Sequence, residues 1–194
     1  MSWGDALALS GLEHLIGSAD YTTEGGLNPE TLQGIGSVHW HQGVGAAVVE
    51  VDEKTGRVVV KRFHAGTYAG RVINPVMASL QTEGNAIMGL GVALSEELIY
   101  DDGQMVNANL SDYLIPSFMD VPEKLSSNEM EDDRGGGAIH GIAESTIPAV
   151  APAVANAIAA ATGIRVYDLP ITPEKILRDK LGAGNFPANK ESKA

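Results

Sequence analysis

The stretch VGAAVVEVDEKTGRVVVKRF, residues 44–63, decides the fold class of this chain. β-branched residues dominate both of its ends, which is typical of strands. The six residues between them, 52–57, have the composition of a hairpin loop, with Gly56 available for a positive φ. Alternation along the second strand predicts that Lys61 lies on the opposite face from Val60 and Arg62. One face of the hairpin is therefore expected to be in water.

Helical patterns follow the hairpin. Asn74 and Pro75 form an N-cap and first-turn pair, and apolar residues then recur near helical spacing as far as Leu94. This helix contains Gly84, Gly89 and Gly91, each costing about 1 kcal/mol relative to Ala, so we expect something to approach it closely. Hairpins combined with helices predict an α+β fold, in which β-hairpins pack with helices.

Two further helices are expected in the C-terminal half. Ser145 and Thr146 would cap an Ala-rich helix over 149–162 that ends at Gly163, and a closing helix would open at 172–174. Between these two helices, residues 164–169 suggest a strand.

The remaining segments carry weaker signals. We expect a short helix within 2–17, an irregular segment over 18–36, and a small second hairpin that turns at 101–103. The acidic run 129–133 is interpreted as a solvated loop. One domain is predicted over 1–181, with an exposed tail over 182–194.

Composition excludes several classes of function. The chain has 13 Lys and Arg against 25 Asp and Glu, a formal charge of −12, which disfavours nucleic acid as a partner. It has no cysteine, so it can provide neither a thiolate nucleophile nor ligands for an iron–sulfur cluster. Its longest apolar run is broken by prolines, and we expect a soluble, cytoplasmic protein with no membrane span.

The sequence GGGAIHGIAE, residues 135–144, is the most informative candidate site. It places the carboxylate of Glu144 at the end of a glycine-rich loop and directly before a predicted helix. Two interpretations stay open on the residues alone. Glu144 could be a general base beside a ligand, or an acidic residue that stabilises the helix N-terminus, and spacing by itself favours the second.

His39 and His41 form a second candidate, because residues two apart on a strand face the same side. A metal-binding β protein built on this pair is therefore a further hypothesis, although no third ligand lies nearby in the sequence. Dinucleotide-binding and phosphate-loop glycine motifs and a serine nucleophile elbow are not found in the sequence.

Ordered blocks through most of the chain resemble the C-terminal part of the molybdopterin-binding large subunit of the xanthine dehydrogenase/aldehyde oxidase family. In chain order they are GRVINP (70–75), QTEG (81–84), GLG (89–91), LSEEL (94–98), DYLIP (112–116), DVP (120–122), AVANAI (153–158), ATG (161–163) and DLPITPE (168–174).

The resemblance implies roles for particular residues. Glu144 matches the family's catalytic glutamate, which removes a proton as a water-derived oxygen attacks an aldehyde or N-heterocycle. Gln81 matches a glutamine that contacts the cofactor, and Gly84 belongs to the same block. Residues Gly141, Ile142 and Ala143 would line the cofactor site through their backbone. No residue of this chain is expected to ligate the metal itself.

The chain departs from the family at three positions. His140 stands where the family usually has Lys, Ala143 where it has Gly, and Met88 where a glutamine is often found. These departures support an alternative hypothesis, a non-catalytic structural or assembly subunit whose site has decayed.

The family's large subunit extends several hundred residues upstream of this pattern, so the resemblance implies a divided subunit. The molybdenum-molybdopterin cofactor, possibly in its cytosine dinucleotide form, would be shared with a partner chain that forms the remaining part of the molybdopterin-binding subunit. The 2Fe-2S clusters and FAD are expected on separate iron–sulfur and FAD subunits, and the substrate is a small molecule.

Overall fold

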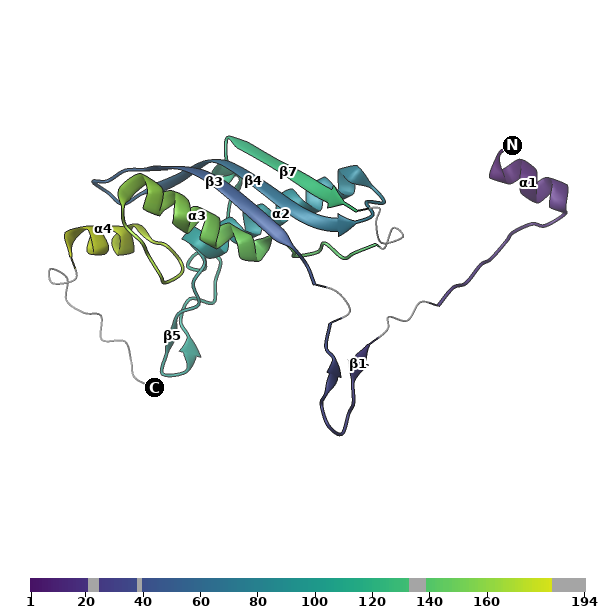
Figure 1. Cartoon of the computed structure of the whole chain (residues 1–194), viewed down its shortest axis with the longest axis horizontal. Coiled ribbons are helices and arrows are strands. Elements are labelled where there is room, and N and C mark those ends of the chain that lie inside the picture. Colours follow the sequence, from purple (N-terminus) through teal and green to yellow (C-terminus); the bar gives the residue numbers. More distant parts are fainter. Residues whose placement is uncertain (21–24, 38–39, 133–138, 183–194) are drawn as a thin grey trace. The chain divides into compact units, whose positions relative to one another are not determined.

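The computed structural model describes residues 1–20, 25–37, 40–132 and 139–182, which fall into two compact units, Met1–Trp40 and His41–Ala194 (Figure 1). The predicted tail therefore lies almost wholly outside the described residues.

The first unit contains helix α1 (Trp3–Ser10) and two short antiparallel strands, β1 (Gly26–Leu27) and β2 (Gly34–Ile35). Ser2 and Asp5 close a capping box at the start of α1, and Gly11 ends the helix in the left-handed conformation. The expectation that 18–36 is wholly irregular is wrong at these two strands. Each strand has only two residues, which is too short to give a recognisable pattern in the sequence.

A three-stranded sheet forms the centre of the second unit. Strands β3 (Gly43–Val51) and β4 (Val58–Gly70) pair antiparallel, and β7 (Lys124–Glu131) adds to β4 in parallel, giving the order β3-β4-β7. The predicted hairpin is confirmed, and Gly56 takes a φ of 74° in its loop.

The expected facing of the second strand is wrong in one respect. Val49 pairs with Val60 and Val48 with Arg62, so Lys61 is an extra residue in the ladder. This bulge lets Val60 and Phe63 be buried while Arg62 is exposed. Val60 and Arg62 therefore do not share a face.

The acidic run is another correction. Residues 129–131 are not a solvated loop but the end of β7, where Glu129 pairs with Thr67 and Met130 with Tyr68. Their strand conformation depends on β4, about sixty residues earlier in the chain, and such distant pairing leaves no local sequence signal.

Helices α2 (Pro75–Leu94) and α3 (Ile147–Thr162) lie against the sheet (Figure 1). Their apolar side chains join those of the sheet in one hydrophobic core. Asn74 caps α2 as predicted, by accepting a hydrogen bond from the Met77 N–H. The core includes Phe63 of β4, Leu90 of α2 and Val150 of α3. The close approaches expected at the α2 glycines come from this chain itself at two positions, because Gly89 faces Val150 and Gly91 faces Pro116 and Glu96.

Helix α4 (Pro173–Leu181) follows a segment that does not form the predicted strand. The apolar side chains of Ile164 and Val166 pack in the core, and no sheet neighbour pairs with residues 164–169 among the described residues. The predicted small hairpin is present as β5 (Tyr100–Asp101) and β6 (Gln104–Met105), and a short helix, η1, spans Phe118–Asp120.

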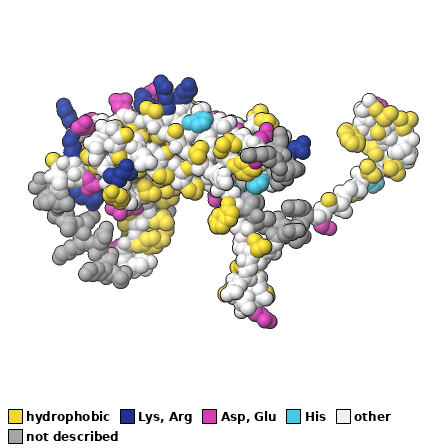
Figure 2. Space-filling model, viewed as in Figure 1, with side chains coloured by type: hydrophobic (Ala, Val, Ile, Leu, Met, Phe, Trp, Pro, Cys, Tyr) yellow, Lys and Arg dark blue, Asp and Glu magenta, His cyan; other side chains and the backbone are white. Residues whose placement is uncertain are grey.

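Apolar side chains remain exposed around β5 and β6, as Figure 2 shows. In the part of the chain that the structure describes, no helix is both long enough and apolar enough to cross a bilayer.

Candidate functional site

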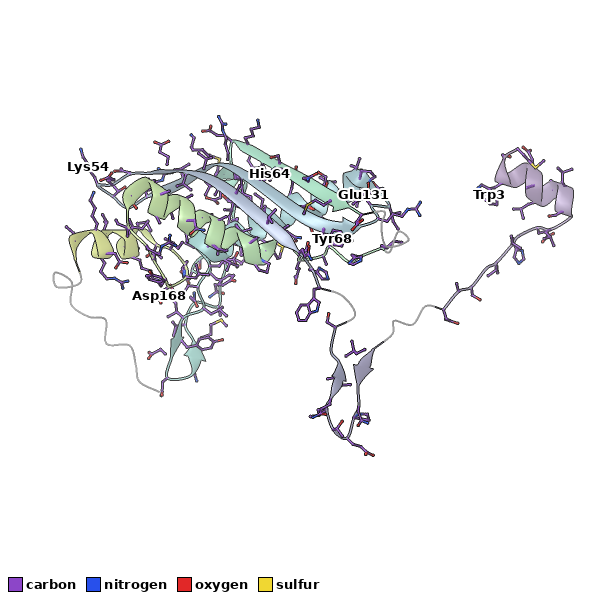
Figure 3. All side chains as sticks on the ribbon, in the orientation of Figure 1. Trp3, Lys54, His64, Tyr68, Glu131 and Asp168 are labelled. Atoms are coloured by element: carbon purple, nitrogen blue, oxygen red, sulfur yellow. The ribbon has the colours of Figure 1, made fainter. Side chains whose placement is uncertain are left out.

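The end of the glycine-rich stretch attaches to the end of β4. Ile139 forms an isolated antiparallel bridge with Gly70, and the His140 N–H donates to the Ala69 carbonyl oxygen at 3.1 Å. Tyr68 lies near the C-terminal end of β4 (Figure 3). The His140 ring meets the Tyr68 ring edge to face, with 5.1 Å between the ring centroids. The chain therefore leaves this bridge in a fixed direction toward α3.

Two side-chain amides of α2 hold the next residues. The Gln81 Nε2 donates to the Ala143 carbonyl oxygen at 2.6 Å, and the Asn85 Nδ2 donates to the Ile142 carbonyl oxygen at 3.3 Å. Gln81 and Asn85 are four residues apart and so lie on one face of the helix. Consecutive carbonyls of the segment before Glu144 are thus bonded to consecutive turns of α2.

Ser145 anchors the other side of Glu144. Its hydroxyl is buried and hydrogen-bonded to the hydroxyl of Thr67 on β4 at 2.5 Å. The sequence suggested Ser145 and Thr146 as caps of the next helix, but Thr146 occupies the N-cap without a side-chain hydrogen bond and Ser145 bonds to the sheet instead. The chain is therefore held immediately before and after Glu144.

The Glu144 side chain itself is exposed in an open cavity of about 560 Å³. The cavity is lined by His41, Gly43, Ala143, Glu144, Ser145, Pro148 and Ala149. No hydrogen bond or ion pair engages the Glu144 carboxylate within the described residues. It is free to meet a group that enters from outside this chain.

Gly43 at the start of β3 brings the sheet against this segment. A Cβ at position 43 would lie 2.3 Å from the Ser145 carbonyl oxygen and 3.2 Å from Thr146 Cα, both backbone atoms that cannot turn aside. Only glycine fits here, so the close approach of β3 helps to fix the Glu144 segment.

A second, mostly apolar cavity of about 310 Å³ lies beside Gln81 and Ile142. His140 and Arg71 also line it, together with residues from the start of α2. The predicted site residues are therefore divided between two cavities, with Ala143 and Glu144 in one and Gln81 and Ile142 in the other.

The predicted glycines have open surroundings. A Cβ at Gly84 would meet no atom within 4 Å, so the surface of α2 is accessible there, one turn from Gln81, and Gly141 is also exposed. Asn85 is 1% exposed, and its Oδ1 has no hydrogen-bond partner among the described residues. Open helix backbone, neutral amides and a buried acceptor are groups that fit a large polar organic cofactor.

Met88 belongs to neither cavity. It lines an apolar cavity of about 440 Å³ on another part of α2, with Val92, Tyr113 and Ile115. Tyr113 donates to Glu96 Oε2 there at 2.6 Å, and this hydrogen bond raises the pKa of Tyr113. The substitution at position 88 thus leaves the lining of the Glu144 cavity unchanged.

The histidine pair cannot be assessed as a pair, because His39 lies outside the described residues. Among the residues that the structure does describe, no three His, Asp or Glu side chains are grouped so that they could hold a metal ion. His41 instead lines the Glu144 cavity.

Sequence reasoning missed Asn85, Thr67 and Gly43. The helical spacing of Asn85 from Gln81 could have indicated the first. Thr67 and Gly43 had no comparable signal, because their contacts with the Glu144 segment join residues roughly eighty to one hundred positions apart in the chain.

Comparison with known proteins shows that this chain is related to molybdopterin-binding proteins. Residues 1–122 match the family described as the molybdopterin cofactor-binding domain. The chain is 36% identical over 79% of its length to the 6-hydroxypseudooxynicotine dehydrogenase complex subunit gamma of Paenarthrobacter nicotinovorans, covering 20% of that protein. It is 41% identical over 69% of its length to the aldehyde oxidoreductase molybdenum-binding subunit PaoC of Escherichia coli K12, covering 19% of it.

Solved structures agree. Quinoline 2-oxidoreductase from Pseudomonas putida 86 is similar over 70% of this chain and 18% of its own, with 38% identity and a TM-score of 0.59. Aldehyde oxidoreductase from Desulfovibrio gigas is similar over 73% and 16%, with 30% identity and a TM-score of 0.65. The chain belongs to the xanthine dehydrogenase/aldehyde oxidase family of molybdenum-binding subunits, and it spans about a fifth of the length of the relatives it matches.

Proposed function

We propose that this chain contributes the catalytic base and part of the molybdopterin pocket to a molybdenum hydroxylase. The observation that carries the proposal is the state of Glu144. Its carboxylate is exposed in an open cavity and unpaired within the described residues. Gln81 and Asn85 hold the backbone before it, and Thr67 holds the hydroxyl of Ser145 after it.

Such an arrangement suits a general base. The backbone anchors limit where the carboxylate can go, and the open cavity lets it reach a reacting group on a neighbouring chain or domain. Proton transfer by a positioned carboxylate contributes about 10²–10⁴ in rate. A carboxylate that served only to stabilise the helix would not require anchors on both sides.

The cofactor would be held on this chain by Gln81, Gly84 and the backbone of Gly141, Ile142 and Ala143. When bound, the molybdenum cofactor supplies the two-electron redox chemistry for which water is the oxygen source. One Nε2–H of Gln81 is used by the Ala143 carbonyl, so Gln81 would offer the cofactor its Oε1 as an acceptor and its second Nε2–H as a donor. Gly84 would allow close approach to α2 because it has no side chain.

The names of two relatives support a substrate class. These are named as an aldehyde oxidoreductase and a quinoline oxidoreductase, and we propose that this chain serves the oxidation of an aldehyde or an N-heterocycle. The remaining part of the molybdenum-binding subunit would complete the pocket, with residues 1–181 of this chain acting as one portion of it. Iron–sulfur and FAD subunits would carry the electrons, as the family resemblance implies, and this chain has no cysteine with which to ligate a cluster itself.

The test is Glu144→Gln in the complex purified with this chain. We expect kcat to fall at least about 10²-fold with the molybdenum content unchanged, because the amide keeps the shape but cannot accept the proton. Glu50→Gln, which alters an exposed carboxylate on β3, is the control and should retain activity. Normal turnover of the Glu144→Gln complex with molybdenum bound would contradict the proposal and would favour a structural or assembly subunit.

A further inference from the structure

Asn85 has a feature that folding alone does not explain. The side chain is almost completely buried, yet only its Nδ2 is used, and its Oδ1 is an acceptor without a partner among the described residues. A buried acceptor that has lost its water lowers stability, and an apolar side chain of the same size would avoid that cost. What Asn85 gains in return is its bond to the Ile142 carbonyl.

That bond lies in a regular set of anchors around Glu144. The carbonyls of Ile142 and Ala143 accept from Asn85 and Gln81, and the Ser145 hydroxyl bonds to Thr67. Ser145 Oγ also lies 3.4 Å from the Ile142 oxygen, but its closer contact at 2.5 Å is with Thr67. These anchors hold the backbone carbonyls of Ile142 and Ala143 and the hydroxyl of Ser145. Within 142–145, only Glu144 is not itself bonded by one of them.

We propose that Asn85 is a positioning residue, which fixes the Ile142 carbonyl and thereby sets the direction in which the Glu144 side chain enters its cavity. Gln81 cannot replace it, because Gln81 holds only the Ala143 carbonyl. The plane of the Ile142–Ala143 peptide could still turn through the ψ of Ile142 and the φ of Ala143. The proposal deepens the proposed function and rests on it for the role of Glu144 as a base.

The experiment compares Asn85→Leu with Thr82→Val, both made in the complex. Leu has nearly the shape of Asn but removes both the used donor and the unpaired acceptor. Thr82 is the matched control, since it is fully buried on the same helix and its hydroxyl donates within α2, to the Ala78 carbonyl at 2.9 Å. Hydrogen exchange of the backbone amides at 142–145 is followed by mass spectrometry.

We expect Asn85→Leu to speed hydrogen exchange at 142–145 by roughly 5–30-fold, which is the size of effect that follows from losing one hydrogen bond. The unfolding temperature should not fall. Thr82→Val should leave exchange at these residues unchanged. In steady-state kinetics, Asn85→Leu should lower kcat by roughly 10–100-fold with little change in KM, because a misdirected base affects the chemical step rather than substrate binding.

Unchanged exchange at 142–145 in the Asn85→Leu complex would overturn the proposal, as would faster exchange with full kcat. If the Leu variant does not assemble, Asn85→Ser, whose hydroxyl is too short to reach Ile142, is measured in the same way. The exchange result does not depend on catalysis, so it can fail while Glu144→Gln still abolishes turnover. Conversely, normal turnover of Glu144→Gln would defeat the proposed function whatever the exchange shows.

Discussion

The two units of this chain differ in how they use apolar residues. The second unit buries residues from β4, α2, α3 and α4 in one core, where Phe63 is 1% exposed. In the first unit no described residue is buried, and Trp3 is 86% exposed. Family resemblance nevertheless runs through both, since the matched residues are 1–122.

The difference shows that the similarity of a sequence to its family and the stability of its fold are separate properties. The second unit has the packing to order its own site, whereas α1 is defined by its capping box and its Gly11 terminus. Isolated helices of this length are marginal in water. The apolar residues of the first unit would therefore need a surface beyond their own unit to be buried.

The largest expected effect tests this comparison directly. Phe63→Ala should lower the free energy of unfolding by about 3–5 kcal/mol, because it leaves a cavity in the core. Trp3→Ala should change it by no more than about 0.5 kcal/mol, as for other exposed positions. Urea titrations followed by circular dichroism measure both. Equal losses for the two variants would show that α1 belongs to the cooperative core.

A smaller effect on the free energy of unfolding distinguishes the packed part of α2 at Gly89 from its open surface at Gly84. Gly89→Ala would bring a Cβ within 2.5 Å of Val150 Cγ2 and should cost about 1–3 kcal/mol through overpacking. Gly84→Ala meets open space and should stabilise the isolated chain by up to about 1 kcal/mol through helix propensity. In the complex, Gly84→Ala should instead weaken cofactor retention, measured as molybdenum content. Stabilisation by Gly89→Ala would contradict the observed packing of α2 against α3.

The smallest effect is a pH dependence that the two units should show differently. The Lys54 N–H donates to Asp52 in the hairpin loop of the second unit, and this bond lowers the pKa of Asp52. In α1, the Ser2 N–H lowers the pKa of Asp5 in the same way. Because each folded pKa is depressed, each contribution is present above 3.8 and is lost as pH falls through the folded value.

We therefore expect Asp52→Asn to lower the urea midpoint at pH 7, with the gap to the unmodified chain closing on acidification below 3.8. Asp5→Asn should leave the midpoint unchanged at every pH, because fraying of α1 does not open the core. A gap that widens at low pH would mean that the sign of the Asp52 effect is wrong.

Local signals predicted the elements that local chemistry determines. The β3–β4 hairpin and the start of α2 have a loop glycine and an Asn cap that act on their near neighbours, so both could be predicted from the sequence. Strand β7 could not, because its sequence KLSSNEME has weak strand character and its conformation comes from parallel pairing with β4.

The site divides in the same way. Glu144, Gln81 and Gly84 were predicted from resemblance to a family, and their roles stay predictions. The structure adds that Gln81 bonds to Ala143 next to Glu144. It also adds the anchors at Asn85 and Thr67, which depend on how α2 and β4 pack against a segment about sixty to eighty residues away.

The most direct measurement of the central claim is the position of the Glu144 carboxylate in an experimental structure of the assembled complex, with the molybdenum located from its anomalous scattering. The account predicts a carboxylate oxygen within hydrogen-bond reach, about 2.6–3.2 Å, of an oxygen or substrate atom at the metal centre. A Glu144 side chain directed into bulk solvent, away from the molybdenum, would contradict it.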